Sequence, residues 1–222
     1  MEILPCIELE TAPSPTISII WLHGLGADGN DFVPIVNQLD LKGIPAIRFI
    51  FPSAPSIPVT INGGYVMPAW YDILGRDLVG KEDSIGIRNS EISIVKLIEN
   101  EFNRGISYEN IVLAGFSQGC AMALHVGLHF PHRLAGIIAL SGYLPLAQSF
   151  VIEKQEVNLG TPIFMGHGTW DPVVIPQRGE ASLHLLREQG YQVDWHTYPM
   201  EHSVHPEELE DISNFLKSIF TK

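Results

Sequence analysis

Apolar residues in this chain fall into short runs that alternate with longer segments of helical periodicity. Seven runs have the length of a strand, and they cover residues 3–10, 16–23, 46–51, 110–115, 134–140, 162–167 and 192–198. The later runs are almost continuously apolar, which is typical of strands covered on both faces of a sheet. The pattern therefore predicts a buried, mostly parallel sheet.

Segments with helical periodicity separate most of these strands. The predicted helices cover residues 31–39, 84–104, 117–129, 176–189 and 206–220. The second of them carries Ile92, Val95, Ile98 and Phe102 at helical spacing. Strands alternating with helices predict an α/β fold, a doubly wound sheet with helices on both faces. No helix separates the first two strands, so we expect them to form an antiparallel edge. Without a Pro/Ser/Gly-rich linker we expect one domain over residues 1–222.

Composition narrows the classes of function. A net charge of −12 argues against nucleic acid as a partner, because such a surface repels polyphosphate. The first residues lack the pattern of a signal peptide, and no apolar run reaches the ~20 residues of a membrane span. Cys6 and Cys120 are the only cysteines, so no disulfide framework is implied. We expect a soluble, cytoplasmic protein.

The strand 110–115 runs into the sequence Gly-Phe-Ser-Gln-Gly and then into a helix. Gly-x-Ser-x-Gly between a strand and a helix is typical of a nucleophile elbow, in which the serine occupies a sharp, strained turn. Gly115 and Gly119 remove Cβ atoms that would collide with neighbouring backbone. The motif therefore predicts Ser117 as a nucleophile.

A serine nucleophile needs a histidine base and a carboxylate that orients the base. On elbow folds these partners follow the serine in the order acid, then histidine. Asp171 comes soon after the strand 162–167, and His202 comes soon after the strand 192–198. Both therefore belong at the carboxyl edge of the sheet, where α/β active sites lie.

The chain also contains rival residues. His205 shares the loop of His202, but Pro206 places it at the opening of the last helix. Asp194 lies within a strand and is a poor rival to Asp171. The remaining histidines outside the glycine-rich motifs are expected to be structural or solvated, and they are His125, His129, His132, His184 and His196.

The predicted strand 16–23 ends in a loop of sequence His-Gly-Leu-Gly. Its glycines let the backbone turn an N–H toward the elbow, and Leu25 is the expected donor. The N–H of Gln118, directly after the nucleophile, is the other expected donor of this oxyanion hole. His23 is expected to order the loop. The loop lacks the ending of a phosphate-binding loop, and its acidic residues argue against phosphate.

Several motifs along the chain together resemble the acyl-protein thioesterase/carboxylesterase family of serine α/β-hydrolases, also labelled phospholipase/carboxylesterase. These motifs are HGLGADG (23–29), AWYD (69–72), GFSQG (115–119), LSGYLP (140–145), HGT (167–169) with DPVV (171–174), and HSV (202–204) with PEE (206–208). The resemblance implies hydrolysis of acyl esters or thioesters, with Ser117, Asp171 and His202 as the triad and Leu25 and Gln118 as oxyanion donors. Metal and organic cofactors are not required. Cys120, Pro68 and Trp170 depart from the usual pattern, which bears on substrate preference rather than on chemistry.

Residues 59–80 hold many apolar side chains between glycines and predict a mobile flap over the acyl site. The alternative is a hydrophobic cluster that packs under a long loop. The expected lining residues are Met67, Trp70, Ile73, Leu74 and Leu144. An open flap would also contact a membrane surface.

The natural substrate stays open at this level. A small ester, a lysophospholipid and an S-acylated protein all fit the predicted chemistry, and a non-catalytic ligand-binding protein on the same fold is the distant alternative. A homodimer is compatible with the resemblance, but no feature of the sequence decides it.

Overall fold

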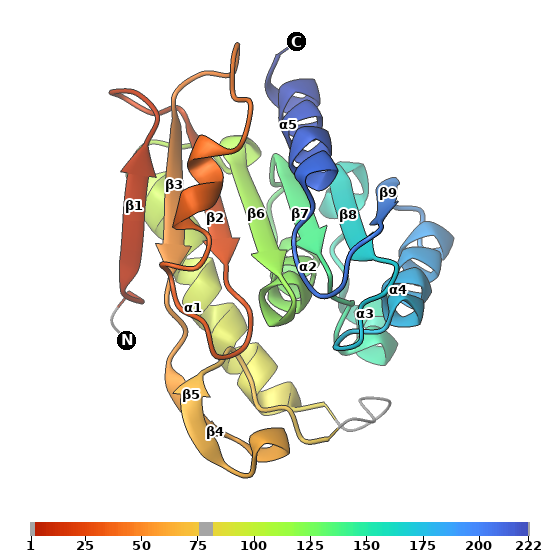
Figure 1. Cartoon of the computed structure of the whole chain (residues 1–222). Coiled ribbons are helices and arrows are strands. Elements are labelled where there is room, and N and C mark those ends of the chain that lie inside the picture. Colours follow the sequence, from red (N-terminus) through yellow and green to blue (C-terminus); the bar gives the residue numbers. More distant parts are fainter. Residues whose placement is uncertain (1–2, 76–81, 222) are drawn as a thin grey trace.

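The structure, a computed structural model, describes residues 3–75 and 82–221. A seven-stranded sheet forms its centre, with the strand order β1-β3-β2-β6-β7-β8-β9 (Figure 1). Its strands are β1 (Cys6–Glu10), β2 (Ile17–Leu22), β3 (Ile47–Pro52), β6 (Ile111–Phe116), β7 (Gly136–Leu140), β8 (Ile163–Gly168) and β9 (Val193–Tyr198). All neighbouring pairs are parallel except β1 with β3. The predicted mostly parallel α/β sheet is confirmed.

The antiparallel edge is formed differently from the prediction. β1 pairs with β3, so that Cys6 lies opposite Pro52 and Glu10 lies opposite Arg48. β2 instead lies inside the sheet, parallel to both β3 and β6. The expectation that the first two strands pair with each other is therefore wrong. Every residue of β2 is buried, whereas β1 is half-buried or exposed, so the more apolar strand occupies the interior.

Helices cover both faces of the sheet, as predicted (Figure 1). One face carries α1 (Ser84–Asn103), α2 (Gln118–His129), α3 (Ala147–Glu153) and α4 (Pro176–Glu188), and the other carries the 3₁₀ helix η1 (Val33–Asn37) and α5 (Pro206–Phe220). A hydrophobic core lies on each face of the sheet, and alternate residues along a strand point into one core or the other. Ile20 and Leu22 of β2 point into the first, and Ile19 and Trp21 point into the second.

Two predicted features of the helices need correction. Residues 31–39 form only the short 3₁₀ helix η1, in which Pro34 lacks the N–H that a longer helix would use. On α1, Ile92 and Phe102 of the expected stripe are 46% and 47% exposed. Ile98 of that stripe is buried as predicted and Val95 packs against the core, but the buried face continues through Ile87, Ile94 and Leu97. Both sets of positions have helical spacing, and only contact with α2 and the sheet decides which of them are buried.

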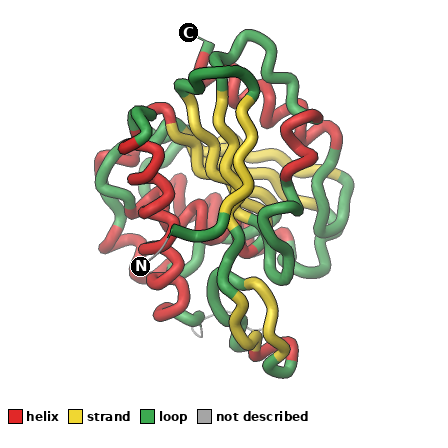
Figure 2. The backbone as a smooth tube through the Cα atoms, turned by 90° about the vertical axis from the view of Figure 1, so that its left-hand side faces the viewer, coloured by secondary structure: helices red, strands yellow, loops and turns green. Residues whose placement is uncertain are grey.

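A hairpin projects beyond the carboxyl edge of the sheet (Figure 2). It consists of β4 (Ser56–Val59), the 3₁₀ helix η2 (Thr60–Asn62) and β5 (Tyr65–Pro68). Most of it falls within the predicted flap, a segment in which the sequence predicted no strand. Pro58 and Pro68 obscured these strands, because proline in a sheet is confined mainly to edge strands, and both strands of this two-stranded sheet are edge strands. Residues 76–80 of the predicted flap lie outside the described residues.

The loops that carry the predicted site leave the sheet at one edge. β2, β6, β8 and β9 are parallel, so their carboxyl ends lie together, and the segments that follow them converge there (Figure 1). Among the helices that the structure describes, none is long and apolar enough to cross a membrane.

Candidate active site

Ser117 occupies a strained turn between β6 and α2. Its backbone adopts φ 56° and ψ −116°, a region that residues other than glycine rarely occupy. A Cβ atom at Gly115 would collide with the carbonyl oxygen of Gly119, and one at Gly119 would collide with that of Leu22. The two glycines therefore let the start of α2 pack closely against the backbone of the neighbouring strands. This packing presents the Ser117 hydroxyl at the edge of the sheet.

Two hydrogen bonds connect Ser117 to a histidine and an aspartate. Nε2 of His202 lies 2.9 Å from Oγ of Ser117. Nδ1 of the same ring lies 2.6 Å from Oδ2 of Asp171, which is buried. The structure thus brings together the three side chains that the sequence singled out. In this arrangement the imidazole can take the serine proton while the carboxylate holds the ring and stabilises its positive charge.

The backbone holds the other oxygen of Asp171. Its Oδ1 accepts the N–H of Val173 at 2.8 Å and that of Val174 at 2.9 Å. These two donors leave Oδ2 as the oxygen that faces His202. The carboxylate is therefore oriented before any substrate arrives.

His167 supports the same loop, a role that the sequence did not reveal. Its ring is buried, and burial lowers its pKa, which keeps the imidazole neutral. Its Nε2–H donates to the carbonyl oxygen of Val174 at 2.8 Å. Nε2 also lies 3.6 Å from Oδ2 of Asp171. Its place in the His-Gly-Thr motif directly before Asp171 was the only available signal.

The loop after β2 lies against the elbow. A Cβ atom at Gly24 would lie 3.4 Å from Cβ of Ser117, so the loop passes directly beside the serine. The N–H of Gly26 donates to the carbonyl oxygen of Pro68 at 2.8 Å. Within the described part of the chain, the N–H groups of Leu25 and Gln118 have no hydrogen-bond partner. Two unpaired donors beside the serine are what an oxyanion needs.

His23 orders this loop, as predicted. Its Nε2 accepts the N–H of Ala54 at 3.0 Å, so the ring carries its proton on Nδ1, which donates to the carbonyl oxygen of Gly24 at 2.7 Å. Burial lowers the pKa of His23 and favours this neutral form. On the other side, the indole N–H of Trp70 donates to the carbonyl oxygen of His23 at 2.9 Å.

Gln118 has a second role that the sequence did not show. Its side chain is buried, where Oε1 accepts the N–H of Trp70 at 2.8 Å and Nε2 donates to the carbonyl oxygen of Tyr71 at 2.7 Å. The residue after the nucleophile thus ties the elbow to the Ala-Trp-Tyr-Asp motif. This motif in turn supports the oxyanion loop through Trp70.

Four of the residues predicted to line the acyl site lie on the hairpin or in the segment that follows it. Met67 lies on β5, where its Sδ would lie 3.5 Å from a Cβ atom at Gly26. Ile73 is partly buried, and Leu74 is 45% exposed. Trp70 is buried beneath the oxyanion loop, with its ring 5.2 Å from that of His23.

Leu144 is placed farther along the same face of the sheet. It is buried and lines a cavity of about 570 Å³ that also touches Leu146, Ser182 and Leu185. Its N–H donates to the hydroxyl of Ser182 at 2.8 Å. That these side chains contact a substrate stays a prediction.

The rival residues have structural partners. His205 caps α5, because its Nδ1 accepts the N–H of Glu207 at 3.3 Å. His125 is buried and lies 3.0 Å from the carboxylate of Glu91. Asp194 pairs with His196 at 2.9 Å. These contacts agree with the structural roles that the sequence predicted for the histidines.

Glu208 is buried in the first turn of α5 without a full set of partners. Its Oε2 accepts the N–H of His205 at 3.4 Å, and its Oε1 has no hydrogen-bond partner among the described residues. Burial raises its pKa from 4.5 to about 8. The sequence singled out this residue only through its place in the motif PEE (206–208).

This carboxyl group predicts a specific dependence of stability on pH. Between about pH 4.5 and pH 8 the folded chain keeps the proton of Glu208, whereas the unfolded chain has lost it. Stability therefore falls as pH rises through this window, by up to about 1.4 kcal/mol per pH unit from this group. In Glu208→Gln we expect that slope to disappear from urea unfolding measured between pH 5 and pH 8. The exposed neighbour Glu207→Gln is the matched control and should keep the slope, and an unchanged slope in Glu208→Gln would contradict the assignment.

Known proteins resemble this chain over most of its length. Residues 7–220 match the sequence profile of a family described as phospholipase/carboxylesterase. The chain is 45% identical to acyl-protein thioesterase 1 of Neurospora crassa, with 90% of this chain and 86% of that protein covered. It is 40% identical to acyl-protein thioesterase 1 of Saccharomyces cerevisiae, with 90% and 91% covered.

Solved structures show the same fold. Arabidopsis thaliana SOBER1 superimposes with a TM-score of 0.87 at 33% identity, over 91% of this chain and 98% of that one. Zea mays acyl-protein thioesterase 2 gives a TM-score of 0.82 at 28% identity, over 96% and 98%.

Proposed function

Because this chain belongs to the phospholipase/carboxylesterase family, we propose that Ser117, His202 and Asp171 are the catalytic triad with which it hydrolyses acyl esters and thioesters. The chain is a hydrolase of the esterase and thioesterase class. The observation that carries the residue assignment is the pair of hydrogen bonds from Ser117 through His202 to Asp171. A complete set of nucleophile, base and orienting carboxylate within hydrogen-bond reach also disfavours a non-catalytic binding protein.

In the acylation step, Oγ of Ser117 forms a bond to the carbonyl carbon while its proton moves to Nε2 of His202. The carbonyl oxygen becomes an oxyanion, which accepts hydrogen bonds from the N–H groups of Leu25 and Gln118. Loss of one such donor costs about 2.7–4 kcal/mol of transition-state stabilisation. When the intermediate collapses, the bond to the leaving sulfur or oxygen breaks, and the leaving group takes the proton from His202.

Deacylation repeats these steps with water. His202 takes a proton from water as its oxygen attacks the acyl carbon, and the bond to Oγ of Ser117 then breaks. The serine recovers its proton from His202, and the carboxylic acid leaves. Asp171 stays ionised throughout and balances the positive imidazolium.

Relatives named acyl-protein thioesterase indicate that the substrate is an acylated protein or lipid. Within that class we favour an S-acylated protein as the main substrate, and a lysophospholipid or a small ester is the alternative. The described part of the predicted flap bears Ile61, Tyr65, Val66 and Leu74 as exposed apolar side chains. We assign to this part of the flap peripheral contact with a membrane that carries the substrate. One domain, a cytoplasmic location and a homodimer stay predictions of the sequence.

A fluorophosphonate probe tests the residue assignment directly. We expect it to modify Ser117, as read by mass spectrometry of the digested protein, and to be blocked by a long-chain acyl thioester. A series of matched oxygen and thiol esters of increasing chain length then defines the substrate class. Modification of a different residue, or a labelled enzyme that still turns over thioesters, would contradict the assignment.

A further inference from the structure

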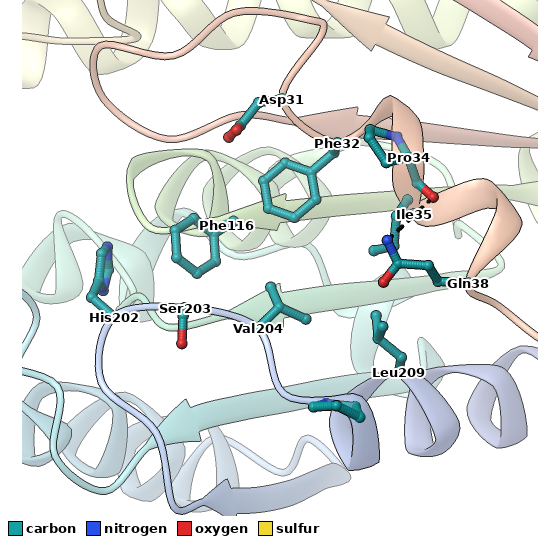
Figure 3. Close-up of a pocket in the computed structure, with 11 residues that line it drawn as sticks. Asp31, Phe32, Pro34, Ile35, Gln38, Phe116, His202, Ser203, Val204 and Leu209 are labelled. Carbon is teal, nitrogen blue, oxygen red and sulfur yellow. Dashed lines mark hydrogen bonds between the residues drawn. The ribbon is translucent and has the colours of Figure 1, made fainter.

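A groove of about 350 Å³ opens beside His202, on the side of α5 and η1 (Figure 3). His202 and Phe116 form its inner end, and Leu209 and Gln38 form its outer end. Its floor consists of aromatic and aliphatic side chains that lie between η1 and the start of α5. The rings of Phe32 and Phe116 lie 5.6 Å apart, and that of Phe116 lies 4.7 Å from His202.

This groove and the predicted acyl site lie on opposite faces of the sheet. Trp70 and Leu144 belong to the core that α1 and α2 cover. Phe32, Phe116 and Leu209 pack against the core that α5 covers. An acyl chain on the hairpin side therefore leaves this groove empty.

The proposed chemistry determines which part of a substrate faces the groove. His202 gives its proton to the leaving atom, so the leaving group departs on the side of the imidazole. A groove that starts at His202 is therefore placed to hold whatever the leaving atom is attached to. For an acyl thioester of a protein, that is the chain on either side of the acylated cysteine.

The polar and charged groups of the groove suit a basic peptide. Asp31 lines it, is exposed, and has no ion-pair partner among the described residues. The hydroxyl of Ser203 also lines it without a hydrogen-bond partner in the described chain. A second hollow continues past Gln38 and Leu209 and is bordered by Glu210. Its cation Lys217 already pairs with Asp40.

Resting on the proposed function, we propose that this groove binds the peptide that carries the acylated thiol, with an apolar side chain on Phe32 and Val204 and a basic side chain at Asp31. The phosphate of a lysophospholipid leaving group would instead meet the negative charges of Asp31 and Glu210. The same charges make an anionic headgroup an unfavourable occupant. The groove therefore selects for acylated proteins by their sequence around the cysteine.

The test uses the full chain and thioesters with one common acyl group. Four leaving groups are compared. They are a cysteine peptide with leucine and lysine beside the cysteine, the same peptide with glutamate in place of lysine, the same peptide with alanine in place of leucine, and a small uncharged thiol. In each variant kcat/KM for the peptides is divided by that for the small thiol. We expect the unaltered chain to prefer the lysine peptide about threefold over the glutamate peptide, as suits one exposed ion pair.

Asp31→Lys should reverse this preference, a total swing of about tenfold. Glu188→Lys makes the same charge change on an exposed residue at the end of α4 and should leave the preference as it was. In Phe32→Ala we expect the preference for a leucine over an alanine beside the cysteine to be lost. A ratio that is the same in Asp31→Lys and in the unaltered chain would overturn the groove proposal while leaving the triad intact. A lysophospholipid of the same acyl chain that outcompetes both peptides would overturn it too, and failure to hydrolyse any thioester would overturn both proposals.

Discussion

Replacing Ser117 with alanine should lower kcat for ester and thioester hydrolysis by about 10⁶-fold. The variant has no oxygen that can form the acyl-enzyme, and His202 loses the group whose proton it would take. What remains is the effect of the oxyanion donors on direct attack by water. Release of nitrophenol from a short-chain nitrophenyl ester and release of thiol from an acyl thioester measure the loss.

The comparison variant for Ser117→Ala is Ser141→Ala. Ser141 is also a buried serine with a positive φ, of 47°, and its Oγ has no hydrogen-bond partner among the described residues. Both variants place alanine at a strained position, so any general effect of backbone strain should appear in both. We expect Ser141→Ala to keep the kcat of the unaltered chain. Equal losses in both variants, or turnover that survives in Ser117→Ala, would show that the nucleophile lies elsewhere.

Replacing Asp171 with asparagine should lower kcat by about 10⁴-fold without unfolding the protein. The N–H groups of Val173 and Val174 would still require an acceptor, so the amide oxygen would take the place of Oδ1. The amide NH₂ would then face Nδ1 of His202, which must give up its proton to accept this bond. The ring would carry its proton on Nε2 and could no longer accept the proton of Ser117.

Thermal unfolding separates this effect from a loss of structure. Asp171→Asn keeps the size of the side chain and its bonds to the backbone, so its Tm should stay near that of the unaltered chain. Asp194→Asn provides the control, because Asp194 also bonds a histidine but does so away from Ser117, and its kcat should be unaltered. Activity within tenfold of the original in Asp171→Asn would exclude the orienting role.

Much of the candidate site could be predicted because its signals are local. The elbow depends on glycines two residues before and after Ser117, which the collisions of their missing Cβ atoms explain. Asp171 and His202 were predictable because parallel strands end at a common edge, so residues after β8 and β9 must lie near the end of β6. His23 was predictable because it precedes the glycines that it orders.

The supporting residues were not predictable, because their partners are remote in the sequence. The side chain of Gln118 bonds the backbone of Trp70 and Tyr71, more than forty residues earlier. A sequence pattern records that a residue is polar but not which distant backbone group it meets. The same reason explains why β1 was wrongly predicted to pair with β2. Its actual partner, β3, is more remote in the sequence, and the pattern of the chain does not identify it.

The sequence by itself determined the fold class, the family, the chemistry and the three side chains proposed to perform it. Each of these depends on spacing along the chain or on the common edge of parallel strands. Only the tertiary structure decided the strand at the antiparallel edge, the buried stripe of α1 and the hairpin beside the site. It also revealed the groove between η1 and α5, whose walls come from residues about 170 positions apart in the sequence. The sequence contains several apolar surfaces that could each be buried, and tertiary packing decides which of them are. A groove forms only where two such surfaces lie side by side without full contact.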